Sequence, residues 1–385
     1  MEGWETRLLG NLCEFQRGLT YGKSDEVDVS DNVVLRANNV DLATHRLDLS
    51  DLRFIADAVA VPAGKKVRKG SLLICTASGS KSHLGKIAYV DEDYGYAFGG
   101  FMGQITAAPG VHDRYLFHAL TSPAYKDFIG ALADGVNINN LKFDDLRQFP
   151  VSVPNFEEQR RIAAILDEAF DGISTAKANA EKNLQNARDL FHGYLQATFD
   201  QVSDSIELSD IAIEITDGDH MPPPKAESGV PFITISNIQK RSREIDFSET
   251  FMVPRDYFDN LKPNRKPRRG DVLYTVTGAT LGIPVLVDHE MEFCFQRHIA
   301  LIRPGLDINS AWLDYAMLSP QVFRQATNGA TGAAQKTVSL SVLRKIRVPR
   351  VSSELQIAVA RRLDAVSAET TRLEDFFALK LSALD

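Results

Sequence analysis

The chain has 385 residues, 44% of them hydrophobic and 24% charged, a composition typical of a globular protein with two or three domains. Its formal net charge of −8 argues against a protein coated all over with nucleic acid, although it leaves room for local DNA contacts. Three distant cysteines without a CxxC pair favour a reducing cytoplasm, and we predict neither a signal peptide nor a membrane span.

The first 155 residues are predicted to form an α+β globule. Short apolar runs are broken by glycine, asparagine and proline, as in "NVVLRANNV" (32–40), "SLLICTA" (71–77) and "GQITAA" (103–108). Such runs are typical of short strands joined by turns. The stretch "RYLFHALTSPAYKDFI" (114–129) has a helical pattern.

A long helix is predicted next, from about Glu157 to Phe199, which would give a rod of roughly 60 Å. Its apolar residues follow one another in steps of 3, 4, 3, 4, 4 and 3, which is a heptad seam with one added residue. The seam residues are Leu166, Ala169, Ile173, Ala176, Ala180, Leu184 and Ala187.

The second half of the chain repeats this plan at low identity. "KKVRKGSLLICTASGSKSHLGKI" (65–87) parallels "RKPRRGDVLYTVTGATLGIPV" (265–285), and "LRQF" (146–149) parallels "LRKI" (343–346). A period near 200 indicates duplicated domains and not a repeat array. We therefore predict a first globule at 1–155, a central helix at 156–200, a second globule at 201–351 and a distal helix at 352–385.

The distal helix has the same apolar steps as the central one, at Leu363, Val366, Thr370, Leu373, Phe377, Leu381 and Leu384. The matching irregularity favours an antiparallel coiled coil between the two helices. Two globules held apart by such a rod would have pseudo-twofold symmetry, which suits a target with two separated half-sites. The alternative is two unrelated amphipathic helices, each packed on its own globule.

Motifs for catalysis are weak or absent in the sequence. "DHMPPPK" (219–225) lacks the aromatic residue of an adenine methyltransferase motif, and no Asp-x-Lys or Glu-x-Lys nuclease pair occurs. "GSKSHLGKI" (79–87) has one residue too many between its glycines for a P-loop and ends in isoleucine. The histidines have no metal-ligand spacing and there is no GxSxG elbow. Binding is therefore the predicted chemistry, and the chain is not predicted to be an enzyme.

The chain resembles the specificity (S) subunit of Type I restriction–modification enzymes over its whole length. The likeness rests on the twofold plan of globule then helix, on "GSLLICTASGS" and "GDVLYTVTGAT", and on "EEQRRIAAILDE" after a proline-containing strand. The resemblance implies that each globule is a target recognition domain reading one half of a bipartite sequence in double-stranded DNA. It also implies assembly with two methyltransferase subunits and two ATP-dependent restriction and translocation subunits. S-adenosylmethionine, ATP and Mg would be used by those partners, with no cofactor bound by this chain.

DNA recognition needs basic groups for phosphates, and amide or hydroxyl groups for base edges. Polar residues at predicted strand ends and in glycine-rich loops meet this need, although a solvated turn residue is about as good a reading for each. Some candidates come from matching places in the repeat: Arg36, Asn38 and Asn39 lie in "VVLRANNV", and Ser236 and Asn237 lie in "FITISNI". The candidates are Tyr21, Lys23, Arg36, Asn38, Asn39, Lys81, Ser82 and Lys86 in the first globule, and Lys225, Ser236, Asn237, Thr277, Thr280, Gln335 and Lys336 in the second.

The end of the central helix, 188–199, has no counterpart in the distal helix. We expect its apolar stripe to be covered by a methyltransferase subunit or by the N-terminal segment of the chain. The stripe consists of Leu190, Phe191, Tyr194, Leu195 and Phe199. A different class of function stays open, in which the chain is a two-headed scaffold that binds proteins only.

Overall fold

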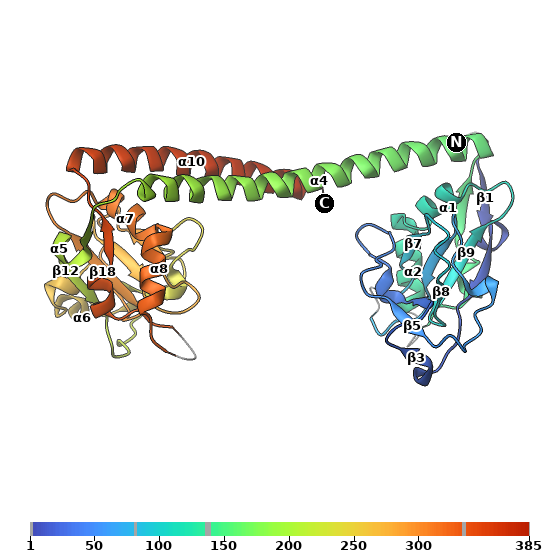
Figure 1. The fold of residues 1–385 in the computed structure, drawn as a ribbon, viewed down its shortest axis with the longest axis horizontal. Helices are drawn as coiled ribbons and strands as arrows, with labels where there is room; N and C mark the ends of the chain where they lie inside the picture. Colours follow the sequence, from blue (N-terminus) through green and yellow to red (C-terminus); the bar gives the residue numbers. More distant parts are fainter. Residues whose placement is uncertain (1–2, 81–82, 135–139, 333–335, 385) are drawn as a thin grey trace. The chain divides into compact units, whose positions relative to one another are not determined.

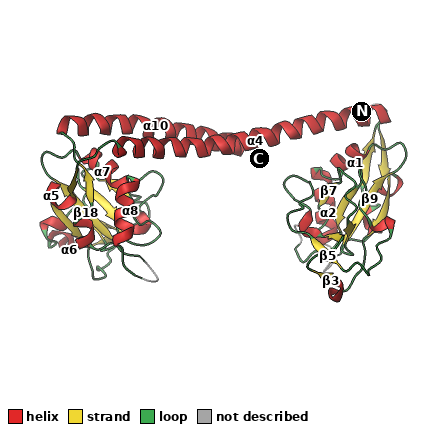
Figure 2. Cartoon of the chain, in the orientation of Figure 1, coloured by secondary structure: helices red, strands yellow, loops and turns green. Residues whose placement is uncertain are grey.

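The computed structural model describes residues 3–80, 83–134, 140–332 and 336–384. The chain divides into two compact units, Met1–Thr175 (unit 1) and Ala176–Asp385 (unit 2), and the division falls inside the long helix α4 (Phe156–Asp200). Each unit is described by itself. Each contains one α+β globule (Figures 1 and 2), which confirms the predicted fold class.

The globule of unit 1 is built from three small sheets. Its terminal strands β1 (Glu5–Leu8) and β10 (Pro150–Val153) form an antiparallel pair that closes the globule. A four-stranded sheet has the order β2 (Cys13–Arg17), β9 (Met102–Ala107), β6 (Leu72–Cys75), β7 (Ile87–Tyr89). The other has the order β3 (Glu26–Val27), β5 (Arg53–Ile55), β4 (Asn32–Leu35), β8 (Ala97–Phe98). The helices are η1 (Leu9–Asn11), η2 (Lys23–Asp25), η3 (Ala37–Asn39), η4 (Ala63–Lys65), α1 (Asp113–Ala119), α2 (Pro123–Asp134) and α3 (Phe143–Leu146).

Strand β6 is buried on both faces, which explains its uninterrupted apolar sequence. Leu72 and Ile74 face a core formed with α1, α2 and α3. Leu73 and Cys75 face the opposite way, into a second core that contains Leu35 of β4. Because successive strand residues point to opposite faces, one short strand joins both cores.

Unit 2 repeats most of these elements in the same order, but its described residues contain no match to η2 and β3, and it has an added helix, α6 (Arg255–Asp259). Strands β11 (Ser205–Glu207) and β19 (Arg347–Pro349) form the closing pair. The larger sheet has the order β12 (Ala212–Asp217), β18 (Ile299–Pro304), β15 (Val272–Thr275), β16 (Pro284–Leu286), and the smaller has the order β14 (Phe251–Val253), β13 (Val230–Ile233), β17 (Cys294–Phe295). The helices are α5 (Leu208–Ile211), η6 (Ile235–Asn237), α6 (Arg255–Asp259), η7 (Pro263–Arg265), α7 (Ser310–Leu318), α8 (Pro320–Gly329) and α9 (Leu340–Arg344). The matching sheet orders confirm the predicted duplication.

Each globule holds the start of its long helix through a buried glutamine. In α4, the Gln159 side chain accepts a hydrogen bond from the backbone N–H of His112 (2.9 Å) and donates one to the carbonyl of Pro154 (2.9 Å). In α10 (Ser353–Leu384), Gln356 makes the same two bonds, with Asn309 (2.8 Å) and Val351 (3.2 Å). These shared bonds give a physical reason for the similarity of "NFEEQ" (155–159) and "SSELQ" (352–356) at the two helix starts.

Within unit 2, α10 and the second half of α4 lie side by side and antiparallel (Figure 1). Arg188 of α4 pairs with Glu374 of α10 (3.2 Å), whereas Leu195 and Phe199, further along α4, share a core with Ala360 and Leu363 near the start of α10. Numbering thus rises on one helix as it falls on the other. All seven predicted seam residues of α10 are buried or half-buried, and this seam is confirmed.

The predicted seam of α4 is wrong at one end. Ala176, Ala180, Leu184 and Ala187 are buried or half-buried, but Ala169 and Ile173 are exposed. The buried face continues instead through residues 188–199. The physical reason is the antiparallel register, in which the start of α10 packs on the end of α4.

The predicted uncovered stripe is therefore also wrong for three of its five residues. Leu195 (0% exposed) and Phe199 (2% exposed) belong to the core of unit 2, and Phe191 packs against that core. Only Leu190 (56% exposed) and Tyr194 (37% exposed) of the stripe face solvent in the described chain. The segment needs no partner protein to cover it, because α10 and the globule of unit 2 do so.

This packing predicts unequal costs for two neighbouring leucines. Leu195→Ala should lower the free energy of unfolding of unit 2 by about 2–5 kcal/mol, because it opens a cavity in a buried core. Leu190→Ala should change it by less than about 0.5 kcal/mol. Urea denaturation in a Trp4→Phe background isolates unit 2, since the fluorescence then comes from Trp312, which lies in the same core. Equal effects of the two substitutions would contradict the packing.

Candidate nucleic-acid interface

The matching asparagines of the two globules, Asn39 in η3 and Asn237 in η6, are buried. The amide of Asn39 donates to the carbonyls of Asp48 (2.8 Å) and Asp51 (2.9 Å), and its oxygen accepts from the backbone N–H of Arg36 (2.9 Å). Asn237 repeats this with Asp246 (3.1 Å) and Thr234 (2.9 Å). Both side chains tie a loop to a strand end, so their burial does not support the predicted base contacts.

The neighbours of these asparagines are more accessible. Asn38 and Ser236 are exposed at matching positions, and the Ser236 hydroxyl lies 2.6 Å from that of Thr234. Arg36 is partly exposed and pairs with Asp51 at 3.1 Å. These three residues stay predicted contacts.

In the glycine-rich loop of unit 1, one predicted DNA contact, Lys86, is wrong because the side chain is buried. Lys86 is only 6% exposed and donates to the carbonyl of Val40 at 2.9 Å. Burial lowers its pKa, and the side chain anchors the loop that follows η3. The other two candidates of this loop, Lys81 and Ser82, lie outside the described residues.

In unit 2, hydrogen bonds of buried threonine hydroxyl groups hold the loop after β15. Thr277 is buried, and its hydroxyl donates to the carbonyl of Lys336 (3.2 Å) and lies 3.1 Å from that of Thr337. Thr280 lies in the same loop and its carbonyl accepts a bond from the Thr275 hydroxyl. Burial thus makes Thr277 structural. Lys336 is exposed, and Gln335 lies outside the described residues.

The remaining candidates lie on segments that meet at one end of each globule. In unit 1, isolated bridges join Leu19 to Gly99 and Ala77 to Asn140, which brings the Tyr21–Lys23 segment, the glycine loop and the β8–β9 turn together. Tyr21 is half-buried, and burial raises its pKa, whereas Lys23 is exposed. In unit 2, the equivalent bridges join Asp219 to Gln296 and Thr277 to Thr337. Lys225 lies near this end with its ammonium 5.2 Å from the Phe251 ring.

A residue that the sequence reasoning missed lies in the β8–β9 turn of unit 1. Phe101 is 73% exposed, and its carbonyl accepts bonds from the backbone N–H groups of Thr76 (2.9 Å) and Ala77 (3.2 Å). These bonds hold the backbone of the turn, and an exposed aromatic side chain on it can stack on or wedge between bases. In the sequence "GGFMG" (99–103), the two glycines indicate a turn, but nothing shows that the phenylalanine is exposed. A single aromatic residue in such a stretch is easily taken for a core residue.

The two basic runs that precede the glycine loops, 65–69 and 265–269, are partly engaged with the protein itself, the second more than the first. Lys65 donates to the carbonyl of Arg17 at 2.8 Å, and Arg265 pairs with Asp217 (3.3 Å) and Asp219 (3.5 Å). Positive charge at this face is thus weaker than the runs suggest, in keeping with the acidic chain.

Several known proteins are similar to this chain in sequence. Residues 1–185 match the family model described as the Type I restriction modification DNA specificity domain. The chain is 30% identical over 184 residues to the type I restriction enzyme StySPI specificity subunit of Salmonella potsdam, covering 47% of this chain and 39% of that protein. It is 22% identical over 402 residues to the EcoKI specificity subunit of Escherichia coli (strain K12), covering 97% and 84%. The chain is thus similar to Type I restriction–modification specificity subunits, and the family model matches 185 of its 385 residues.

Two solved structures share the fold of this chain. A chain from a structure describing complex assembly and conformational transition of the type I R-M system aligns with a TM-score of 0.73 at 18% identity, covering 100% of this chain and 95% of that one. The HsdS subunit from Thermoanaerobacter tengcongensis aligns with a TM-score of 0.65 at 18% identity and the same coverage.

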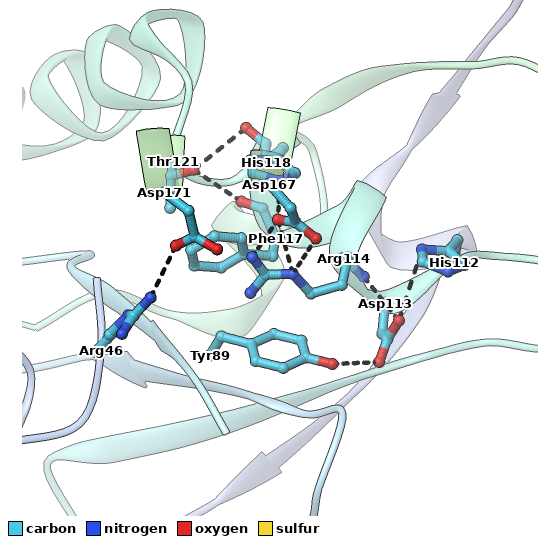
Figure 3. Close-up of polar contacts among 10 residues, drawn as sticks. All are labelled: Arg46, Tyr89, His112, Asp113, Arg114, Phe117, His118, Thr121, Asp167 and Asp171. Atoms are coloured by element: carbon cyan, nitrogen blue, oxygen red, sulfur yellow. Dashed lines mark hydrogen bonds and ion pairs between the residues drawn. The ribbon is translucent and has the colours of Figure 1, made fainter. Parts of the chain in front are cut away.

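The globule of unit 1 meets α4 through a cluster that we call the unit 1 joint (Figure 3). The joint consists of Tyr89, Arg114, Phe117 and His118 of the globule and Asp167 of α4. Arg114 Nε lies 3.0 Å from both carboxylate oxygens of Asp167, and His118 Nε2 lies 2.7 Å from one of them. The same guanidinium covers the rings of Tyr89 (4.4 Å) and Phe117 (4.6 Å). Charge pairing and ring contacts thus fix the globule on its helix.

The joint also shapes the ionisation of its members. Burial alone would raise the pKa of Asp167, but the hydrogen bonds from Arg114 and His118 hold it below its ordinary value. Burial lowers the pKa of His118 despite the carboxylate beside it. The carboxylate is therefore the charged partner of the Arg114 guanidinium, with a largely neutral imidazole against it.

No group of three or more histidine, cysteine, aspartate or glutamate side chains among the described residues is placed to hold a metal ion. None of the helices in the described part of the chain is long and apolar enough to cross a membrane.

Proposed function

We propose that the chain is the non-catalytic DNA specificity subunit of a Type I restriction–modification complex. Each globule reads one half of a bipartite DNA target, and α4 and α10 set the spacer and dock methyltransferase subunits. Two methyltransferase and two restriction and translocation subunits complete the complex. Those partners use S-adenosylmethionine, ATP and Mg, and this chain binds none of them.

The observation that carries the proposal is the repetition of one globule-and-helix plan in register. Sheet order, the buried asparagine of η3 and η6, and the glutamine at each helix start all recur. A duplicated reader suits a target with two half-sites, because each copy presents the same loop cluster to DNA. Accessible polar and aromatic groups at that cluster include Lys23, Asn38 and Phe101.

A protein-only scaffold is the second candidate, favoured by the net charge of −8. Salt dependence separates the two functions. The chain is co-expressed with a Type I methyltransferase subunit, the methylated adenines are mapped, and the affinity for DNA carrying that motif is measured against salt.

We expect a bipartite motif and a DNA affinity that falls steeply with salt. Six to ten phosphate contacts would give a loss on the order of 10³- to 10⁵-fold between about 50 and 200 mM salt. DNA with one half-site scrambled is the matched control and should bind far more weakly. Affinity for protein alone, with no methylation motif that depends on this chain, would favour the scaffold.

A further inference from the structure

The joint between globule and helix exists twice, and its positions recur 197 residues apart, although most of the residue types differ. Strands β7 and β16 correspond, as do helices α1 and α7. The positions of the unit 1 joint therefore have equivalents in what we call the unit 2 joint. Tyr89, Arg114, Phe117, His118 and Asp167 correspond in turn to Leu286, Ala311, Asp314, Tyr315 and Asp364.

Of the two contacts that Asp167 makes in unit 1, with His118 and with Arg114, only the first has a counterpart among the described residues of unit 2. Asp364 of α10 accepts a hydrogen bond from the Tyr315 hydroxyl at 2.8 Å, as Asp167 interacts with His118 in unit 1. The arginine is replaced by alanine at position 311. A different arginine, Arg243, lies with its guanidinium 5.0 Å from the Tyr315 ring and pairs with Asp314, so the arginine contact of Asp167 has no match at Asp364 among the ion pairs of the described residues. In unit 1 the Arg114 side chain fills the space between Tyr89, Phe117 and Asp167 (Figure 3).

In unit 2 an open cavity of about 510 Å³ lies at this place. Its lining includes all five members of the unit 2 joint, Leu286, Ala311, Asp314, Tyr315 and Asp364. The cavity is thus lined by the positions that in unit 1 surround Arg114, with Arg243 on one wall. Its volume falls in the range of ligand-binding clefts, about 300–1,000 Å³, and exceeds the room that one side chain needs.

Charge in this cavity is unbalanced. Four carboxylates line it, those of Glu244, Asp288, Asp314 and Asp364, against the single arginine Arg243 and one histidine. Arg243 has a positive φ of 55°, and its Nη1 lies 2.5 Å from Asp314 Oδ2. One guanidinium therefore neutralises one of the four carboxylates.

Two lining residues carry polar atoms that lack a partner. Asp314 is 5% exposed, and its Oδ1 is buried with no donor within the described ranges. Burial raises the pKa of Asp314 despite the nearby Arg243. Both ring nitrogens of His289 are likewise buried without a partner in the part of the chain that the structure describes. Such groups are costly unless something binds to them.

We propose that this cavity of unit 2 is a binding site for a guanidinium group carried by an arginine side chain of the methyltransferase subunit. A planar guanidinium with five donors matches carboxylates at the wall of a partly apolar cavity, and unit 1 contains that arrangement within its own chain. The cavity borders α10, one of the helices proposed to dock that subunit. The choice of the methyltransferase subunit as the protein that carries this arginine rests on the proposed function. The preference of the cavity for a guanidinium group does not depend on it.

The first experiment uses the full chain and a small probe, without DNA or partners. N-acetyl-L-arginine amide is titrated by calorimetry or ligand-observed NMR, with N-acetyl-L-citrulline amide as the uncharged control of the same shape. We expect binding of the arginine compound at least tenfold tighter than that of the citrulline compound. Equal or absent binding of the two compounds overturns the proposal.

Three variants place the probe. Ala311→Arg should abolish probe binding, because the new side chain takes the place that Arg114 has in unit 1. Asp364→Asn keeps the shape and the Tyr315 contact but removes the charge, and should weaken binding about tenfold. Asp167→Asn in unit 1 is the matched control and should leave binding unchanged. If Asp167→Asn acts like Asp364→Asn, the probe binds elsewhere and the site is wrong.

A second experiment identifies the source. Co-purification with the methyltransferase subunit is compared for the natural chain and for Ala311→Arg, after thermal melting has shown that the variant is folded. Reduced assembly supports an arginine of that subunit, and excess probe should then weaken the natural complex. Unchanged assembly rejects the subunit as the source. Neither experiment depends on DNA recognition, so failure of the proposed function would be seen separately.

Discussion

Replacing residues 1–175 with the corresponding region of a specificity subunit of different target should change one half of the methylated sequence and leave the other half unchanged. The reason is structural autonomy. The globule of unit 1 is closed by its own terminal strands β1 and β10 and contains its own cores. The second globule has the same independence through β11 and β19. Methylation mapping of the chimera in complex with the methyltransferase subunit measures the result.

The position of the exchange should matter for stability. A junction at 155 keeps the contacts of Gln159, because they go to backbone groups that any donor supplies. It separates Asp167 from Arg114 and His118, however, and a partly buried aspartate left without those partners is costly. A junction at 175 moves the whole unit 1 joint together. We expect both chimeras to have the same new half-site, with a higher melting temperature for the junction at 175.

Two outcomes would contradict this. A change in both half-sites would show that the globules do not read independently. Equal melting temperatures of the two chimeras, with a donor lacking the arginine and histidine, would show that the unit 1 joint does not hold the globule to α4.

Much of the fold was predictable because it depends on local periodicity and on duplication. The long helices show their heptad steps directly, and strands such as β6 show as apolar runs between turn residues. The register of α10 on α4 was not predictable from those steps, because a heptad seam fits several registers. The buried contacts of Leu195 and Phe199 with the start of α10 decide it, and they join residues far apart in sequence.

The candidate site was harder to predict, because the same residue types serve two purposes. Asn39 and Asn237 were chosen as base readers on their amide groups, yet buried carbonyls of the loops that they close use those amides. Sequence alone does not say which polar groups face inward. The joints did leave a signal, since Gln159 and Gln356, and Asp167 and Asp364, are identical pairs 197 residues apart within helices of otherwise low identity. Identical polar residues on the buried side of a helix indicate a tertiary contact.

Lengthening both long helices by one heptad should lengthen the preferred DNA spacer by about three base pairs, because a helix gains about 10 Å over seven residues and DNA rises about 3.4 Å per base pair. The insertions belong at matching levels of the antiparallel pair. Duplicating residues 178–184 in α4 and 369–375 in α10 repeats the seam residues. It also leaves the ion pairs of Arg188 with Glu374 and of Arg241 with Asp375 on the side of unit 2.

Rotation makes the new spacer less favourable than the old one. Three base pairs turn DNA by roughly a quarter to a third of a helical turn, since a full turn takes about 10–10.5 base pairs. A heptad of helix nearly restores its own orientation, because 3.6 residues make a turn. The connections at 155, 201 and 351 must therefore absorb the difference, and we expect weaker binding with both half-site sequences unchanged.

The measurement is methylation mapping on a DNA library in which only the spacer varies. The matched control carries the duplicated heptad in α10 alone, which lengthens that helix without adding residues between the two globules, and its preferred spacer should equal that of the natural chain. A preferred spacer that stays the same in the doubly lengthened chain would mean that α4 does not set the distance. The spacing would then have to come from the partner subunits, which hold the two recognition globules on DNA from outside.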